Sequence, residues 1–120
     1  MSPCLDLLTR ELQSAGFPTR VTHLQTTGTI KSLSHDVAHL RDDTFEPLLA
    51  EGQDFIVVLH SLAGFPGGVA VKGLSKAERR DSSRGSIIGI ICIAAVVPVE
   101  GISVTDMMGG QLAPWGRADV

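Results

Sequence analysis

The stretch FIVVLHSLAGFPGG, residues 55–68, joins a fully apolar run to a serine and a group of glycines. The run FIVVL is apolar at every position and β-branched at three, which is typical of a strand covered on both faces of a parallel sheet. Ser61 follows that run, and Gly64, Gly67 and Gly68 come after it at the expected start of a helix. The sequence therefore predicts a strand, a sharp turn that holds Ser61, and a helix.

Helical and strand patterns alternate on both sides of this stretch. Upstream, leucines at helical spacing predict a helix over residues 3–15, and a short apolar alternation predicts a strand over 19–24. A second helix should begin after Ser32 or Ser34 and reach Gly52, with Pro47 kinking or splitting it. These elements precede the strand that leads to the serine.

Downstream, the run SIIGIICIAAVV predicts another fully buried strand, in which Ile91 should lie under helices on both faces. A short helix is expected over residues 103–108 in an otherwise turn-rich end. Helices that alternate with strands predict an α/β fold. We expect a doubly wound, mainly parallel sheet of about three strands, in a single domain over residues 1–120.

Composition narrows the classes of function. The 120 residues carry a formal net charge of −3, and the ten basic residues form no extended face, so nucleic acid is not expected as a partner. The longest apolar run, residues 87–99, is too short to span a bilayer, so no membrane is expected either. Cys4 and Cys92 lack metal-ligand spacing, and Cys92 reads as a buried free thiol. We expect no metal, no cofactor and a cytoplasmic location.

The strand, serine and helix have the order of a nucleophile elbow, in which a strained turn exposes a serine hydroxyl at the carboxyl end of a sheet. In that arrangement the amide of the next residue, Leu62, can donate to a developing oxyanion. The usual pattern is G-x-S-x-G, and here Leu59 and Ala63 occupy the two glycine positions. A phosphate-binding loop is the alternative for the glycines, but no Gly-Lys-Ser/Thr follows, so a helix start fits better.

Two long segments carry a resemblance to a known family: FIVVLHSLAGFPGGVAVKGLSKAERR and GSIIGIICIAAVVPVEGISVTDMMGG. They resemble fungal-type α/β-hydrolases of the AB hydrolase-1 kind, which are serine hydrolases. The resemblance implies a partial α/β-hydrolase fold, truncated to the middle of the domain, with residues 97–120 as the start of the cap. It also implies Ser61 as nucleophile, Leu62 as the oxyanion amide and a small ester as substrate.

The general base is harder to find, because in that family the acid and the histidine follow the serine. All four histidines here precede Ser61, namely His23, His35, His39 and His60. His35 and His39 fit a solvated helix face better than a metal site, and the side chain of His60 should point away from Ser61. Asp106 falls in the cap-like segment, so no acid is assigned.

Three functional hypotheses remain open. The first is a serine hydrolase for esters or related acyl bonds, weakly active or inactive as this chain. The second is a non-catalytic interaction or regulatory protein with the same scaffold, and the third is a small enzyme that uses Ser61 with an unconventional base. The resemblance also implies a missing strand between residues 19–24 and 55–59, so we expect self-association or a protein partner through exposed strand edges.

Overall fold

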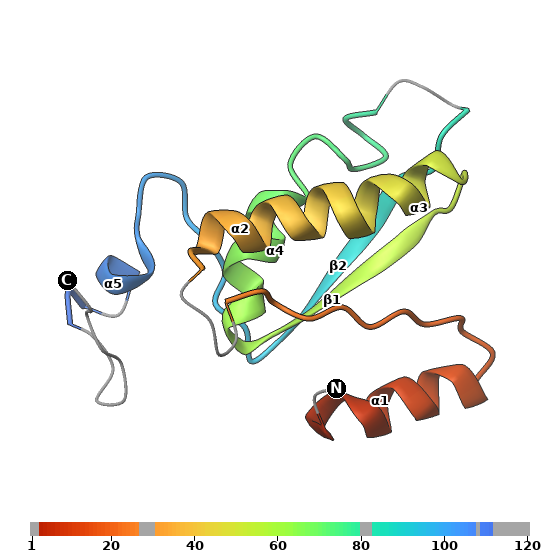
Figure 1. Ribbon diagram of the computed structural model, residues 1–120, viewed down its shortest axis with the longest axis horizontal. Coiled ribbons are helices and arrows are strands. Elements are labelled where there is room, and N and C mark those ends of the chain that lie inside the picture. The colour runs from red at the N-terminus through yellow and green to blue at the C-terminus, as the bar shows by residue number, and fades with distance from the viewer. Residues whose placement is uncertain (1–2, 27–30, 80–82, 108, 112–120) are drawn as a thin grey trace.

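The computed structural model describes residues 3–26, 31–79, 83–107 and 109–111. In chain order its elements are α1 (Pro3–Ser14), α2 (Leu33–Ala38), η1 (His39–Phe45), α3 (Glu46–Ala50), β1 (Phe55–His60), η2 (Ser61–Ala63), α4 (Gly64–Ala70), β2 (Ile87–Ile93) and α5 (Val104–Met107). In Figure 1 the α2, η1 and α3 elements form one long helix, and α1 lies on the opposite side of the strands. The described chain thus combines helices with a parallel sheet, as an α/β fold requires.

The sheet is built from β1 and β2, which run parallel with Val57 opposite Ile90. Parallel neighbours need a crossover connection, and the chain that contains α4 supplies it. Before β1, the Asp54 carboxylate accepts hydrogen bonds from the Ser86 amide at 2.9 Å and the Ser86 hydroxyl at 3.1 Å. The Phe55 amide donates to the Ser86 carbonyl at 3.2 Å. These contacts hold the amino ends of the two strands together.

The third strand expected over residues 19–24 is absent from the described sheet, whose order is β1–β2. Instead, this segment contacts the long helix, because Thr22 Oγ1 lies 3.3 Å from His39 Nε2. The amides of Gln25 and Thr26, just after the segment, donate to Asp36. A strand forms only where a neighbouring backbone completes its ladder. The apolar alternation in the sequence indicated an extended course, but it did not indicate a partner.

The long helix stays continuous past Pro47, where a kink or split was expected. Its middle part, η1, is π-helical, and the Glu46 amide donates to the Arg41 carbonyl five residues earlier. Pro47 then falls in the first turn of α3, where the absence of an N–H group is tolerated. The π winding also puts Leu40 and Phe45 on one buried face, although residues five apart in an α-helix point about 140° apart.

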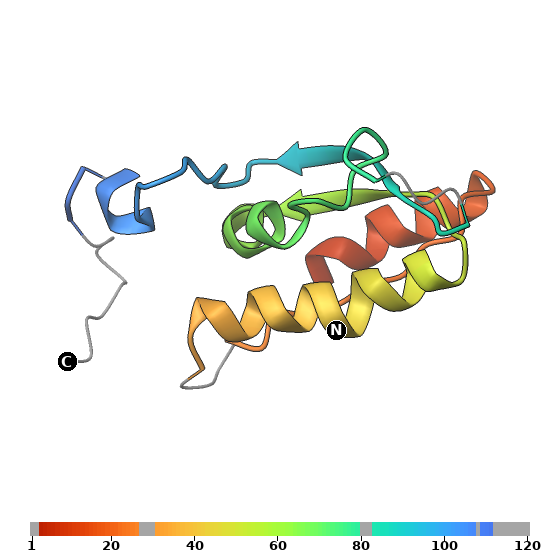
Figure 2. The same cartoon turned by 90° about the horizontal axis from the view of Figure 1, so that it is seen from above.

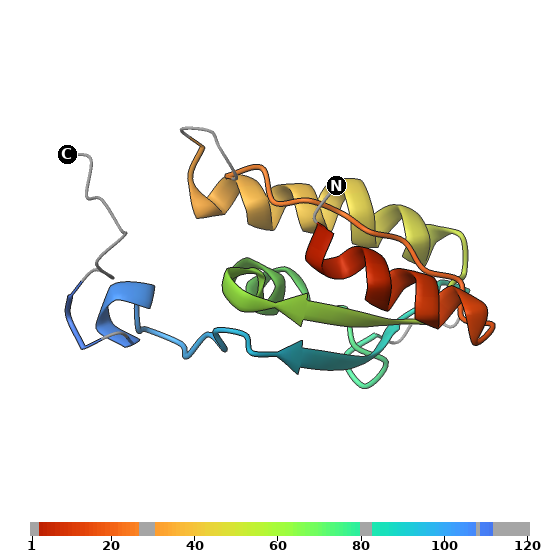
Figure 3. The same cartoon turned by 90° about the horizontal axis from the view of Figure 1, so that it is seen from below.

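The hydrophobic core lies between the long helix, α4 and the adjoining face of the sheet. Its buried members are Leu40, Phe45, Leu49, Val57, Leu59, Ala70, Leu74 and Ile87. Figures 2 and 3 show α4 beside β1, whereas β2 lies at the outer side of the sheet. The expectation that helices cover both faces of β2 is therefore wrong: Ile91 is 49% exposed, and Cys92 is exposed rather than buried.

The two terminal helices agree with the sequence patterns. α1 and α5 lie where the leucine spacing and the short helical signal placed them. α1 remains only loosely covered, because Leu7 is 65% exposed and Phe17, just after the helix, is 62% exposed. None of the helices in the described ranges is both long and apolar enough to cross a membrane.

Aspartate substitutions on the two strands test this one-sided burial. Val57→Asp should unfold the domain, because Val57 is 8% exposed and an unpaired buried carboxylate costs several kcal/mol against a total stability of about 5–15 kcal/mol. Ile91→Asp should leave a cooperative thermal transition, because water reaches that side chain. Thermal melting followed by circular dichroism measures both variants. Equal loss of structure in the two variants, at concentrations at which the chain is monomeric, would contradict the one-sided burial of the sheet.

Candidate active site

Ser61 occupies a strained turn between β1 and the helical turn η2. Its φ angle is +56°, in the left-handed region that residues other than glycine rarely adopt. Such a conformation costs about 1–2 kcal/mol and is frequent at functional sites. The Val96 amide holds the turn by donating to the Ser61 carbonyl at 3.0 Å. The serine is exposed at the carboxyl end of β1, as the sequence predicted for a nucleophile elbow.

Leu59 and Gly67 explain how the turn accepts a bulky residue where glycine was expected. Leu59 is 5% exposed, and a Cβ atom built on Gly67 would overlap its Cδ2 atom. The strand and α4 therefore approach closely because the glycine lies on the helix instead of the strand. Gly64 has a similar role, since a Cβ atom there would overlap the Val96 carbonyl oxygen. Small residues still relieve crowding around Ser61, but they lie after the five-residue motif, at Gly64 and Gly67.

Gly67→Ala tests this close approach. In an open helix the change would stabilise by about 0.5–1 kcal/mol, but the clash with Leu59 should make it destabilising by about 1–3 kcal/mol. Chemical denaturation of Gly67→Ala, of Leu59→Ala and of the variant with both changes would measure the coupling energy between the two residues. Gly89→Ala is the control, because its added Cβ would lie 3.7 Å from Ile56 Cγ1, an ordinary contact. Additive effects of the two substitutions would refute the proposed contact.

Leu62, the predicted donor to an oxyanion, lies directly after the strained residue. Its side chain is 41% exposed. Within the described ranges, no group accepts a hydrogen bond from the Leu62 amide. The Gly64 amide, in contrast, donates to the carbonyls of Ser61 and Leu62. The Leu62 amide is thus free for a ligand beside the Ser61 hydroxyl. This geometry provides a hydroxyl and one N–H donor at the same edge of the sheet.

No base accompanies the nucleophile candidate in the described part of the chain. The Ser61 hydroxyl makes no hydrogen bond to any described residue. The side chains of His23 and His60 are exposed, and neither makes a hydrogen bond to a described residue. His35 is engaged elsewhere, because its Nδ1 atom accepts from the Ser32 amide at 3.1 Å at the start of α2. Asp106 is also engaged, since its Oδ2 atom accepts from the Ser103 hydroxyl at 2.7 Å. The structure does not bring these groups to Ser61.

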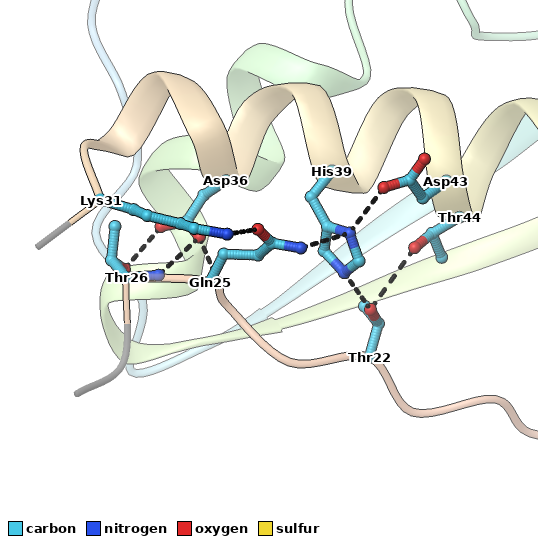
Figure 4. A network of polar contacts seen from close by, with 8 residues as sticks. All are labelled: Thr22, Gln25, Thr26, Lys31, Asp36, His39, Asp43 and Thr44. Atoms are coloured by element: carbon cyan, nitrogen blue, oxygen red, sulfur yellow. Dashed lines mark hydrogen bonds and ion pairs between the residues drawn. The ribbon is translucent and has the colours of Figure 1, made fainter. Parts of the chain in front are cut away.

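His39 lies in a polar network that the sequence analysis missed (Figure 4). Its Nδ1 atom lies 2.9 Å from Asp43 Oδ2 and 3.1 Å from Gln25 Nε2, and its Nε2 atom lies 3.3 Å from Thr22 Oγ1. The ring is 23% exposed, so the expected solvated helix face is wrong for this residue. The four-residue spacing of His39 and Asp43 could have indicated the pair. The network ties the segment before α2 to η1.

Asp36 is the most deeply buried polar residue near this network, with no exposed surface. Its Oδ1 atom accepts from the amides of Gln25 and Thr26, and its Oδ2 atom accepts from the Thr26 hydroxyl at 2.6 Å. Three donors thus satisfy a carboxylate that would otherwise be costly to bury. Asp36 fixes residues 25–26 against α2, a role that no sequence motif indicated.

Replacing Asp36 tests how much its hydrogen bonds contribute to the stability of the fold. Asp36→Ala leaves three partly buried donors without their acceptor and should lower the free energy of unfolding by about 1–3 kcal/mol. Asp36→Asn retains one acceptor oxygen and should cost less. Asp43→Ala is the matched control, because its side chain is 66% exposed and its loss should cost less than about 1 kcal/mol. Urea denaturation decides the ranking, and an Asp36→Ala variant as stable as Asp43→Ala would contradict it.

The described residues contain no group of three or more histidine, cysteine, aspartate or glutamate side chains able to hold a metal ion.

Comparison with known proteins gives one relative among curated proteins. The chain is 31% identical over 106 residues to "Probable hydrolase R7" of Phoma sp. (strain ATCC 20986 / MF5453), a match that covers 83% of this chain and 40% of the relative. The chain therefore spans about two fifths of the length of that protein. No family model and no solved structure matches the chain.

Proposed function

We propose that this chain carries the nucleophile turn of a serine hydrolase that acts on esters or related acyl bonds. The observation that carries the proposal is the left-handed Ser61, held directly after a parallel strand and before a helix. That order is the nucleophile elbow of α/β-hydrolases. The similarity to a protein named as a probable hydrolase supports the same class.

In this proposal, Ser61 Oγ attacks the acyl carbon of a small ester and the alcohol leaves, so that an acyl-serine forms. The proton of the hydroxyl must pass to a base as the bond forms. The Leu62 amide donates to the oxygen that becomes negative in the tetrahedral intermediate. Water then releases the acid and restores the hydroxyl.

The lack of a base beside Ser61 among the described residues sets the expected rate. General-base assistance contributes about 10²–10⁴-fold, so a chain without it should be a poor enzyme even with a well-placed hydroxyl. The second hypothesis, a non-catalytic interaction protein on this scaffold, gains support from the same fact. No described histidine or acid contacts Ser61, and His39 is engaged with Asp43.

An added base distinguishes the two hypotheses. The full chain is incubated with an activated short-chain ester in the presence and absence of imidazole, and the acylated residue is identified by mass spectrometry. We expect little turnover without imidazole and an imidazole-dependent acyl group on Ser61, because the buffer then supplies the proton acceptor. Ser61→Ala should abolish that label, and Ser103→Ala, which alters another exposed serine, should leave it unchanged.

The outcomes separate the hypotheses clearly. Acylation spread evenly over several hydroxyl and amine groups would reject Ser61 as an activated nucleophile and favour the interaction protein. Rapid turnover without imidazole that disappears in Ser61→Ala would instead indicate an unconventional base within the chain.

A further inference from the structure

The outer edge of β2 is the part of the sheet most open to another chain. In Figures 2 and 3 β2 is the outermost strand, and only the loop after α4 approaches its amino end. There, Ile87 donates to the Leu74 carbonyl, and the Lys76 amide donates to the Ile87 carbonyl. Residues 89–93 have no such cover among the described residues.

Backbone groups of two residues point outward along this open edge. The Phe55 amide points toward β2, so by alternation Val57 and Leu59 also direct their backbone groups there. Their register partners, Ile90 and Cys92, therefore direct N–H and C=O groups away from β1. The sequence GIICI over residues 89–93 contains no charge and no proline, the features that usually protect an edge strand.

Apolar surface reaches this edge on both faces of the sheet. On the α4 side, an open groove of about 780 Å³ has an apolar lining that includes Phe65, Val69, Ile88, Ile90, Pro98 and Val99. On the other face, Val58 lies opposite Ile91, and Ile93 follows two residues later. These three side chains are 40–49% exposed. One strand added at this edge would cover apolar side chains on both faces at once.

We propose that a second copy of this chain pairs with β2, with the two β2 strands antiparallel about a two-fold axis at Ile91. Ile91 is the midpoint of the open segment, so this register uses all of it. Ile90 of each copy then forms a hydrogen-bonded pair with Cys92 of the other, and the sheet grows from two strands to four. Sheets of three or more strands with an apolar face are far more stable than isolated pairs.

Charge favours a second copy in this orientation. Lys72 and Lys76 lie at the amino end of β2 with Glu78, and Glu100 lies beyond its carboxyl end. The Ser75 hydroxyl donates to Glu78 and holds the pKa of that carboxyl below its usual value, so Glu78 stays charged. Lys72 and Lys76 thus place positive charge near the amino end of β2, and Glu100 places negative charge beyond its carboxyl end. A two-fold axis places the two ends side by side, and this complementarity steers like chains together.

Sedimentation of the purified full chain over a range of micromolar concentrations tests the proposal. Wild type should shift from monomer toward dimer as its concentration rises. Ile90→Lys should weaken dimerisation by at least about tenfold, because it adds a charge to the paired edge. Leu7→Lys removes a comparably exposed apolar side chain on α1 and should leave the dimer unchanged.

Disulfide trapping tests the register independently of whether Ile90→Lys folds. In a Cys4→Ser, Cys92→Ser background, Ile91→Cys should oxidise to a covalent dimer, because residues at the axis form a close, non-hydrogen-bonded pair. Ile93→Cys in the same background should not, because it lies opposite residue 89 of the other copy. A chain that is monomeric at all concentrations, a dimer unaffected by Ile90→Lys, or equal trapping at both positions would overturn the proposal.

Discussion

The close packing of Leu59 on Gly67 is the contact on which the rest of the structure depends. It brings the helix that follows the serine turn down onto β1, and it closes the core against Leu49 and Ala70. If α4 stood farther from the strand, the turn at Ser61 would open and its backbone would relax from the left-handed region. A steric relation between a strand and a helix thus maintains the strain at a residue between them.

Local sequence patterns predicted the elements that depend on local chemistry. The apolar run before Ser61, the glycines after it and the leucines of α1 each determine a backbone conformation over a few residues, and the structure has those elements. Features that depend on a distant partner were not predicted. The segment at residues 19–24 lacked a neighbouring strand, β2 lacked a second helix layer, and His39 found partners far apart in the sequence. A run of residues shows what a strand can bury, but not what will cover it.

The candidate site also combines features that local sequence determines with features that depend on distant residues. The position of Ser61 and the free amide of Leu62 follow from the turn itself, and both were predicted from fourteen consecutive residues. A proton acceptor must come from another part of a fold, so its location depends on tertiary structure. Strain at Ser61 persists although no described residue bonds to its hydroxyl. Strain of this kind belongs to the scaffold, because the packing of α4 on β1 maintains it without a hydrogen bond to the serine hydroxyl.

The π-helical winding of η1 determines how this chain tolerates changes in length. Each residue removed from an α-helix rotates everything after it by about 100°. Loss of one residue within η1 would let the segment wind as an α-helix, and Leu40 and Phe45 would then be four residues apart, a spacing that keeps both on the buried face. The change of winding would therefore absorb the lost residue, and Leu49 should stay in the core and Glu46 beside Arg84. Insertions and deletions are usually best tolerated in loops, and here the middle of a helix is a place where the loss of one residue should leave the alignment of the two layers in place.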